Sequence, residues 1–256
     1  MCFDLDSRPP IPPIAGAAVD GRRAELQSAD GTCFAAFVAS PAQPSGAGML
    51  ILPDVRGLHT FYEELALRFA EAGIEALAID YFGRTAGTPP RRPDFEHNPH
   101  VDQTRWPTLQ MDMRAGRDEL ASQHGVRALF SVGFCYGGRL AFLSATRPEL
   151  GLSGAIGFYG VVAGKGRVDL PAPVDLATEM RCPILGLFGG DDASIPPESI
   201  ARFDASLSAG GVDHDLIAYP GAPHSFFDRK AADFAAQSAD AWAHVLDFVA
   251  RHTPDA

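Results

Sequence analysis

The sequence predicts a single α/β domain with a mainly parallel, doubly wound sheet and helices on both of its faces. Short apolar runs alternate with stretches whose apolar residues recur at helical spacing, which is typical of strands and helices in such a sheet. The length of 256 residues fits one domain spanning 1–256. A hydrophobic share of 46% and a charged share of 21% supply the material for a buried sheet.

The first third of the chain is expected to contain a hairpin and one β-α-β unit. Residues 1–20 form a proline-rich lead. Residues 23–28 and 33–39 have strand-like composition around a turn at 29–31, which predicts an antiparallel pair. The apolar runs 48–53 and 74–80 predict buried strands, and the helical spacing over 61–72 predicts the helix between them.

The remaining chain continues the alternation after one long interruption. Residues 83–107 are rich in Pro, Gly and Arg and too long for a plain connector, so we expect a functional excursion that acts as a lid over a pocket. A helix around 109–120 follows. The later expected elements are strands at 127–133, 152–159, 183–188 and 214–219, and helices at 137–147, 197–207 and 234–252.

Composition and charge exclude several classes of function. The net charge of -11 would repel a phosphate backbone, so we expect no nucleic-acid partner. The chain has no run of eighteen or more apolar residues and no signal peptide pattern, which indicates a cytoplasmic protein without membrane contact. The four cysteines are scattered and form no C-x-x-C pair, so neither a metal site nor a disulfide framework is expected.

The strongest chemical signal is Gly133-Phe-Cys135-Tyr-Gly137-Gly138, between an expected strand and an expected helix. It has the G-x-nucleophile-x-G form of a nucleophile elbow, in which the turn is so tight that flanking Cβ atoms would clash. The helix N-terminus also favours a thiolate. The alternative, that Cys135 is merely a small buried hydrophobe, does not account for this context. Cys2, Cys33 and Cys182 lack flanking glycines, and we expect no chemistry from them.

A nucleophilic thiol needs a base and an acid that orients the base. His224 follows the last expected strand, whereas His214 begins that strand and so lies at the opposite edge of the sheet. His224 is therefore the expected base. Asp191 and Asp192 follow the strand 183–188, and one of them should meet His224; spacing alone does not choose between them.

The oxyanion of an attacked ester needs two backbone N–H donors. One donor is expected from Tyr136, directly after the nucleophile. The other is expected from Val55, in the loop that follows the strand at 48–53.

These motifs resemble the dienelactone hydrolase family, α/β-hydrolases that carry Cys in the elbow. The elbow, the acid loop Gly-Gly-Asp-Asp192-Ala-Ser-Ile-Pro and the histidine loop Pro-His224-Ser-Phe-Phe stand in the family's order, over a region from about residue 49 to the closing helix. The resemblance implies an α/β-hydrolase fold and Asp192 as the catalytic acid. It also implies a thiol-modulating carboxylate at Asp54, where well-known members carry Glu. Arg229 and Arg105 are candidates for the arginines that bind a substrate carboxylate.

The expected function is hydrolysis of small esters or lactones through a Cys135 thioester, without metal or cofactor, by a monomer or small homo-oligomer. Two alternatives stay open. One is a carboxylesterase or thioesterase of other specificity; the other is a non-hydrolytic, redox-sensing thiol protein.

Overall fold

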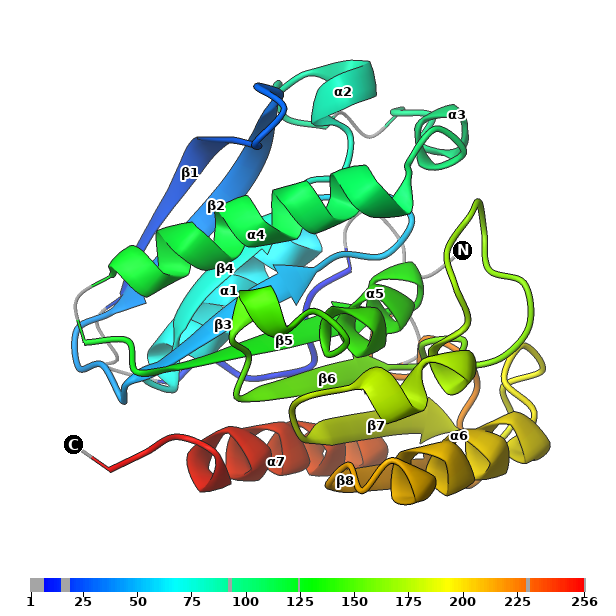
Figure 1. Cartoon of the computed structure of the whole chain (residues 1–256). Coiled ribbons are helices and arrows are strands. Elements are labelled where there is room, and N and C mark those ends of the chain that lie inside the picture. Colours follow the sequence, from blue (N-terminus) through cyan, green and yellow to red (C-terminus); the bar gives the residue numbers. More distant parts are fainter. Residues whose placement is uncertain (1–6, 15–18, 92–93, 124, 229–230, 256) are drawn as a thin grey trace.

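A computed structural model of the chain describes residues 7–14, 19–91, 94–123, 125–228 and 231–255. Its centre is an eight-stranded sheet with the order β1-β2-β4-β3-β5-β6-β7-β8 (Figure 1). The pairs β1/β2 and β2/β4 are antiparallel, and every other neighbouring pair is parallel. The predicted α/β class with a mainly parallel sheet is confirmed.

The strands lie close to their predicted places. They are β1 (Val19–Gln27), β2 (Cys33–Pro41), β3 (Ala47–Leu52), β4 (Glu75–Ile79), β5 (Ala128–Phe134), β6 (Gly154–Phe158), β7 (Ile184–Gly189) and β8 (His214–Tyr219). The hairpin is longer than predicted, because β1 pairs with β2 from Val19↔Pro41 to Gln27↔Cys33. The last residues of the predicted lead 1–20 are therefore strand.

The helices alternate with the strands. They are α1 (Thr60–Glu71), α2 (Gly83–Ala86), α3 (Asn98–Val101), α4 (Trp106–Ser122), α5 (Tyr136–Ser144), α6 (Pro197–Ala209) and α7 (Ala235–Arg251), with 3-10 turns at Pro148–Leu150, Pro173–Asp175 and Ala177–Glu179. The excursion predicted at 83–107 contains α2, α3 and the first two residues of α4. No helix in the described part of the chain is long and apolar enough to cross a bilayer.

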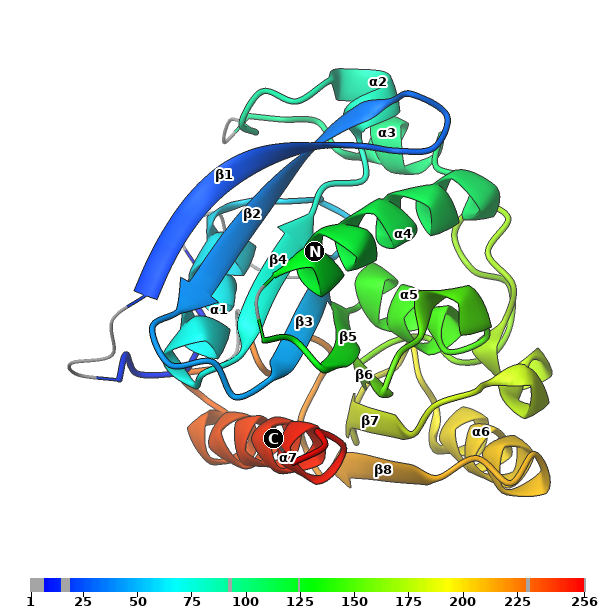
Figure 2. The ribbon, with the colours of Figure 1, turned by 60° about the vertical axis from the view of Figure 1, so that its left-hand side comes forward.

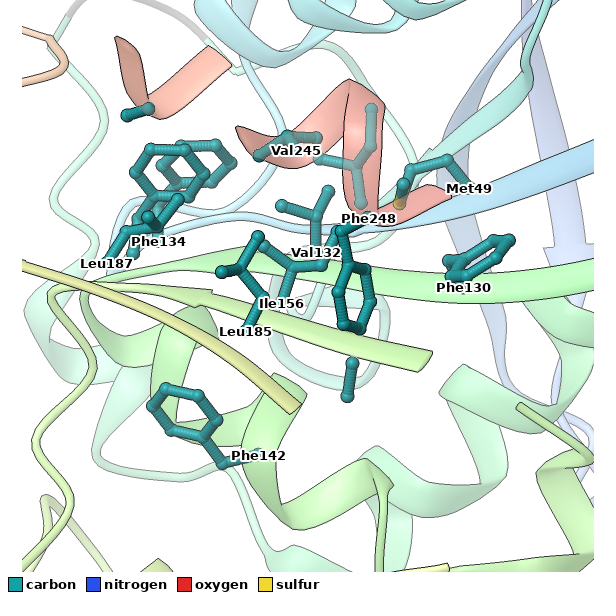
Figure 3. Packing of buried hydrophobic residues seen from close by; sticks show 14 of the residues in the cluster. Met49, Phe130, Val132, Phe134, Phe142, Ile156, Leu185, Leu187, Val245 and Phe248 are labelled. Atoms are coloured by element: carbon teal, nitrogen blue, oxygen red, sulfur yellow. The ribbon is translucent and has the colours of Figure 1, made fainter. Parts of the chain in front are cut away.

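The sheet has helices on both faces, as predicted. Figure 2 shows α1 and α7 on one face and α4, α5 and α6 on the other. In Figure 3, Val245 and Phe248 of α7 lie on one side of the central strands and Phe142 of α5 on the opposite side. The rings fit because β6 carries glycine where each ring lies closest. A Cβ on Gly154 would lie 2.5 Å from Phe248, and one on Gly157 would lie 2.2 Å from Phe142.

The carboxyl ends of the parallel strands converge at one edge of the sheet. The loop after β3 meets the first turn of α5 there: a Cβ on Gly137 would lie 2.0 Å from the Leu52 carbonyl oxygen. The loop after β7 packs against the loop after β8, because the Asp191 N–H donates to the Ala222 carbonyl at 2.9 Å. This edge is the expected location of a site in an open parallel sheet.

Candidate active site

Cys135 lies between the end of β5 and the start of α5, where the elbow was predicted. Its backbone has φ 55° and ψ -109°, a conformation that costs free energy in a non-glycine residue and persists only when the surroundings enforce it. The Cys135 N–H donates to the Phe158 carbonyl at 3.0 Å, which fixes the turn to the end of β6.

The glycines around Cys135 give the turn its shape by close backbone approach. A Cβ on Gly133 would lie 1.9 Å from the Gly137 carbonyl oxygen. A Cβ on Gly138 would lie 2.6 Å from the Phe158 carbonyl oxygen. Real Cβ contacts are never so short, so side chains at these positions would force the strand, the turn and the helix apart.

The histidine and acid loops bring their side chains together. His224 Nδ1 lies 2.6 Å from Asp192 Oδ2, and the other Asp192 oxygen accepts the Ser194 N–H at 2.8 Å. The Asp192 side chain is 1% exposed and His224 is 25% exposed, so the carboxylate is buried behind an imidazole that reaches the surface. Asp191 is exposed. Of the two neighbouring carboxylates, the structure therefore pairs Asp192 with the histidine.

The loop after β3 contains two more predicted residues, Asp54 and Val55. The Asp54 side chain is fully buried; its Oδ1 accepts the Arg56 N–H at 2.8 Å, and its own N–H donates to the Tyr62 hydroxyl at 2.9 Å. Burial raises the pKa of Tyr81 well above its ordinary value, and the nearby Asp54 and Cys135 side chains add to that rise. Asp54 and Cys135 therefore act electrostatically on the same phenol. Val55 is half-buried in the same loop.

Tyr136 joins the elbow to the 83–107 segment. It is the first residue of α5, so its backbone N–H has no carbonyl four residues earlier within the helix. Its hydroxyl lies 2.7 Å from Thr104 Oγ1, and its ring meets Tyr81 edge-on at 5.7 Å. Burial raises the pKa of Tyr136 to about 12, so the phenol stays protonated at neutral pH. The contacts of Tyr81 and Thr104 with Tyr136 were not predicted from the sequence, because neither residue belongs to a recognisable motif.

The structure does not place either of the two arginines predicted from the sequence, Arg229 and Arg105, against the elbow. Arg229 lies outside the described residues. Arg105 is exposed, and its guanidinium donates to the carbonyl oxygens of Asp102 at 3.0 Å and Thr104 at 2.7 Å. Its hydrogen bonds are thus local to the start of α4.

Two other arginines, Arg56 and Arg167, affect the pKa values of side chains in the 83–107 segment and at the elbow. Burial lowers the pKa of His97, and the positive charges of Arg56 and Arg167 lower it further. Arg167 also counteracts the rise in the pKa of Tyr136 and forms a 2.8 Å ion pair with Asp102. The place of Arg56, directly after Val55 in the predicted oxyanion loop, is a signal by which it could have been found from the sequence.

The other thiols lie in environments that differ from the elbow. Burial raises the pKa of Cys182 to about 12, which keeps this thiol protonated and unreactive. Cys33 is half-buried at the start of β2. Within the described residues, no cluster of three or more His, Cys, Asp or Glu side chains could hold a metal ion.

Comparison with known proteins agrees with this architecture. The family model described as "Dienelactone hydrolase family" matches residues 34–253. A Yersinia pestis protein named "Putative carboxymethylenebutenolidase" is 32% identical over 85% of this chain and 83% of its own length. A Bradyrhizobium protein named "Probable 2-oxo-3-(5-oxofuran-2-ylidene)propanoate lactonase" is 30% identical over 80% of this chain and 83% of its own length.

Comparison with solved structures identifies the same fold. The crystal structure of a "Putative Dienelactone Hydrolase" from Klebsiella pneumoniae superposes with a TM-score of 0.78 and 27% identity, covering 91% of this chain and 99% of that one. The predicted α/β-hydrolase fold is thereby confirmed. With a family model matched over most of its length, this chain belongs to the dienelactone hydrolase family.

Proposed function

We propose that this hydrolase cleaves small esters or lactones by acyl transfer to Cys135, with His224 as base and Asp192 as orienting acid. The observation that carries the proposal is the 2.6 Å contact between Asp192 and His224 Nδ1, at the same sheet edge as a cysteine held at φ 55°. Strained backbone at a nucleophile is a recurrent feature of elbows. A buried carboxylate on Nδ1 fixes the tautomer and orientation of an imidazole base.

The mechanism follows from these roles. His224 Nε2 takes the Cys135 proton, and the thiolate attacks the substrate carbonyl carbon. The oxyanion that forms is stabilised by the backbone N–H groups of Tyr136 and Val55. The tetrahedral intermediate then expels the substrate's leaving oxygen, which receives the proton from His224. Water, deprotonated by the same imidazole, hydrolyses the Cys135 thioester and regenerates the thiol.

The nucleophile restricts the substrates. A thiolate leaves more readily than an alkoxide, so the tetrahedral intermediate returns to substrate unless the substrate's own leaving oxygen is stabilised. Enol lactones and activated aryl esters satisfy this condition, since an enolate or phenolate carries its charge by delocalisation. We therefore assign enol lactones as the preferred class.

Asp54 is assigned to modulate the thiol. It is a buried carboxylate that shares the neighbourhood of Tyr81 with Cys135. A carboxylate in this position would act on the negative charge that develops at sulfur when the thiol reacts.

Arg56 and Arg167 favour a substrate with a carboxylate. Both lower the pKa of His97, and Arg167 also acts on the side chain of Tyr136, the residue next to the nucleophile. A guanidinium group matches a carboxylate in charge and in hydrogen-bonding geometry, so we assign these two arginines to the substrate's carboxylate. Arg56→Met and Arg167→Met should raise the KM for a carboxylate-bearing dienelactone and leave that for p-nitrophenyl acetate unchanged.

The first test is hydrolysis of p-nitrophenyl acetate and of a dienelactone by wild type, Cys135→Ala and His224→Ala, with iodoacetamide inactivation in parallel. Cys33→Ala is the matched control, because it removes a half-buried thiol outside the site. We expect both activities to disappear in the Cys135 and His224 variants and on alkylation, and to persist in Cys33→Ala.

Three outcomes would contradict parts of the proposal. Activity that survives Cys135→Ala removes the thiol mechanism. A preference for simple aryl esters over dienelactone assigns a general carboxylesterase or thioesterase. Reversible oxidation of Cys135 without turnover of either substrate assigns a redox-sensing thiol.

A further inference from the structure

Tyr159 lies where the loops of the proposed triad meet. It directly follows β6, is fully buried and has φ 37°, an unfavourable conformation for a non-glycine residue. Its N–H donates to the Leu187 carbonyl of β7 at 2.7 Å, on the strand that leads to Asp192. The carbonyl of the residue before it, Phe158, accepts the Cys135 N–H. The backbone at this point is therefore tied to the elbow and to the strand of the acid loop.

The side chain of Tyr159 reaches the third loop. Its hydroxyl donates to Asp228 Oδ2 at 3.1 Å, four residues beyond His224. Its ring centre lies 5.0 Å from that of His224 and 5.8 Å from that of Phe226. One tyrosine thus contacts the imidazole itself and the far end of the loop that carries it.

The histidine loop needs such a restraint. Ser225, the residue after His224, is buried and has φ 63°, so the chain turns through an unfavourable conformation directly beside the imidazole. The Asp228 N–H donates to the Ser225 carbonyl at 3.2 Å and closes the turn. Asp228 is itself buried, which makes its hydrogen bond with Tyr159 costly to break.

We propose that Tyr159 and Asp228 are positioning residues that hold the His224 imidazole in its catalytic orientation, an inference that rests on the proposed thiol hydrolase function. The ring of Tyr159 limits the movement of the imidazole, and the hydroxyl fixes the turn through Asp228. Loss of the hydroxyl leaves the ring in place but frees the end of the loop. The imidazole then spends less time aligned between Asp192 and Cys135, which lowers kcat without changing substrate binding.

The test compares Tyr159→Phe with a matched control. Tyr219→Phe also removes a tyrosine hydroxyl that donates to an aspartate, Asp240, at 2.9 Å, but that bond joins β8 to α7 and not to the histidine loop. The Tyr219 ring, which contacts Phe226, is kept by the substitution. We expect Tyr159→Phe to lower kcat for p-nitrophenyl acetate by about 10-fold or more with KM within about 2-fold, because small misalignments of a catalytic group reduce rates by such factors. Tyr219→Phe should keep the wild-type kcat.

Two further measurements separate positioning from general loss of structure. The pH profile of Cys135 alkylation by iodoacetamide reports the proposed coupling between His224 and the thiol, and it should change in Tyr159→Phe but not in Tyr219→Phe. Asp228→Asn keeps an oxygen that accepts the hydroxyl and should retain most of kcat, whereas Asp228→Ala should lose as much as Tyr159→Phe. The Asp228 pair also tests the proposal if Tyr159→Phe fails to fold.

The outcomes distinguish this inference from the function on which it rests. Cys135-dependent activity with a wild-type kcat and alkylation profile in Tyr159→Phe overturns the positioning role alone. Equal losses in Tyr159→Phe and Tyr219→Phe, or equal losses in Asp228→Asn and Asp228→Ala, overturn it as well. Activity that survives Cys135→Ala overturns both.

Discussion

Two regions flank Cys135, and they are held in place by different forces. The elbow is fixed by backbone: Gly133 and Gly137 allow main-chain atoms to approach where any side chain would collide. The 83–107 segment is fixed by side chains. Arg91 forms an ion pair with buried Asp80, donates to the Gly87 carbonyl at 2.8 Å and lies over the Phe95 ring at 5.0 Å.

This difference predicts how each region should respond to amino-acid substitution. Contacts between main-chain atoms have little freedom to relax, so a single added methyl group at the elbow is severe. Contacts between side chains far apart in the sequence can be removed singly, and the segment can reorganise around the loss. We therefore expect effects on folding at the elbow and graded effects on stability and rate at the 83–107 segment.

The largest effect is expected from Gly137→Ala. The new methyl group would lie 2.0 Å from the Leu52 carbonyl oxygen and 2.3 Å from that of Pro53, both in backbone that cannot move away without breaking the sheet edge. We expect a loss of about 4 kcal/mol or more of unfolding free energy, measured by urea denaturation. Gly211→Ala is the control, because Gly211 has φ +67° but nothing within 4 Å of its Cβ position; it should cost about 1 kcal/mol. Equal costs in the two variants would show that the Leu52 and Pro53 backbone gives way to the new methyl group and that the collision is not severe.

The second effect is expected from Arg91→Met. The Asp80 side chain is fully buried and the Arg91 side chain is 8% exposed, so removing the guanidinium leaves a buried carboxylate without its counter-charge. Breaking a buried pair in this way costs about 3–5 kcal/mol. Asp80 also accepts the N–H groups of Leu58 at 2.9 Å and Phe82 at 3.1 Å, so the loop after β3 should loosen and kcat should fall.

A double variant tests the origin of that cost. Asp80→Asn with Arg91→Met removes both charges and should recover part of the lost stability in urea denaturation. Arg114→Met is the surface control, because Arg114 and Asp118 are 4.0 Å apart and both exposed, and it should change stability by less than about 0.5 kcal/mol. No recovery in the double variant would mean that Arg91 acts through packing on Phe95.

The two regions also differ in how far the sequence predicted them. The place of the elbow between β5 and α5 could be predicted because its glycines stand together in six consecutive residues, although Gly137 and Gly138 approach backbone that is distant in the sequence. The Arg91–Asp80 pair joins residues whose meeting depends on how a polar segment folds back, and no pattern marks it. The same limit explains why spacing alone did not choose between Asp191 and Asp192. The family resemblance selected Asp192, and the structure buries the Asp192 carboxylate behind His224.

A pH dependence should arise at His59, the residue directly before α1. Burial lowers the pKa of His59 to about 3, and the positive charges of Arg56 and His97 contribute. In the unfolded state the His59 imidazole binds a proton near pH 6.5, whereas in the folded state it binds one only near pH 3. The contribution of neutral His59 to the free energy of unfolding is therefore fully present above pH 6.5. It falls by up to about 1.4 kcal/mol per pH unit as the pH decreases below 6.5. His59→Gln should flatten this part of the stability curve, and His244→Gln, at an exposed histidine, should leave it unchanged.

The smallest effect is expected from Thr104→Val, which removes the contact between the 83–107 segment and the elbow at nearly constant shape. The Thr104 hydroxyl donates to the Val101 carbonyl at 2.7 Å and lies 2.7 Å from the buried Tyr136 hydroxyl, so valine leaves that phenol short of one partner. We expect a stability loss of about 1–2 kcal/mol and a modest rise in KM, because the segment would close less well over the site. Thr104→Ser keeps the hydroxyl and should restore both values. If Thr104→Val keeps the wild-type values and Thr104→Ser loses them, the methyl group and not the hydroxyl holds the segment to the elbow, and the two regions are joined by packing alone.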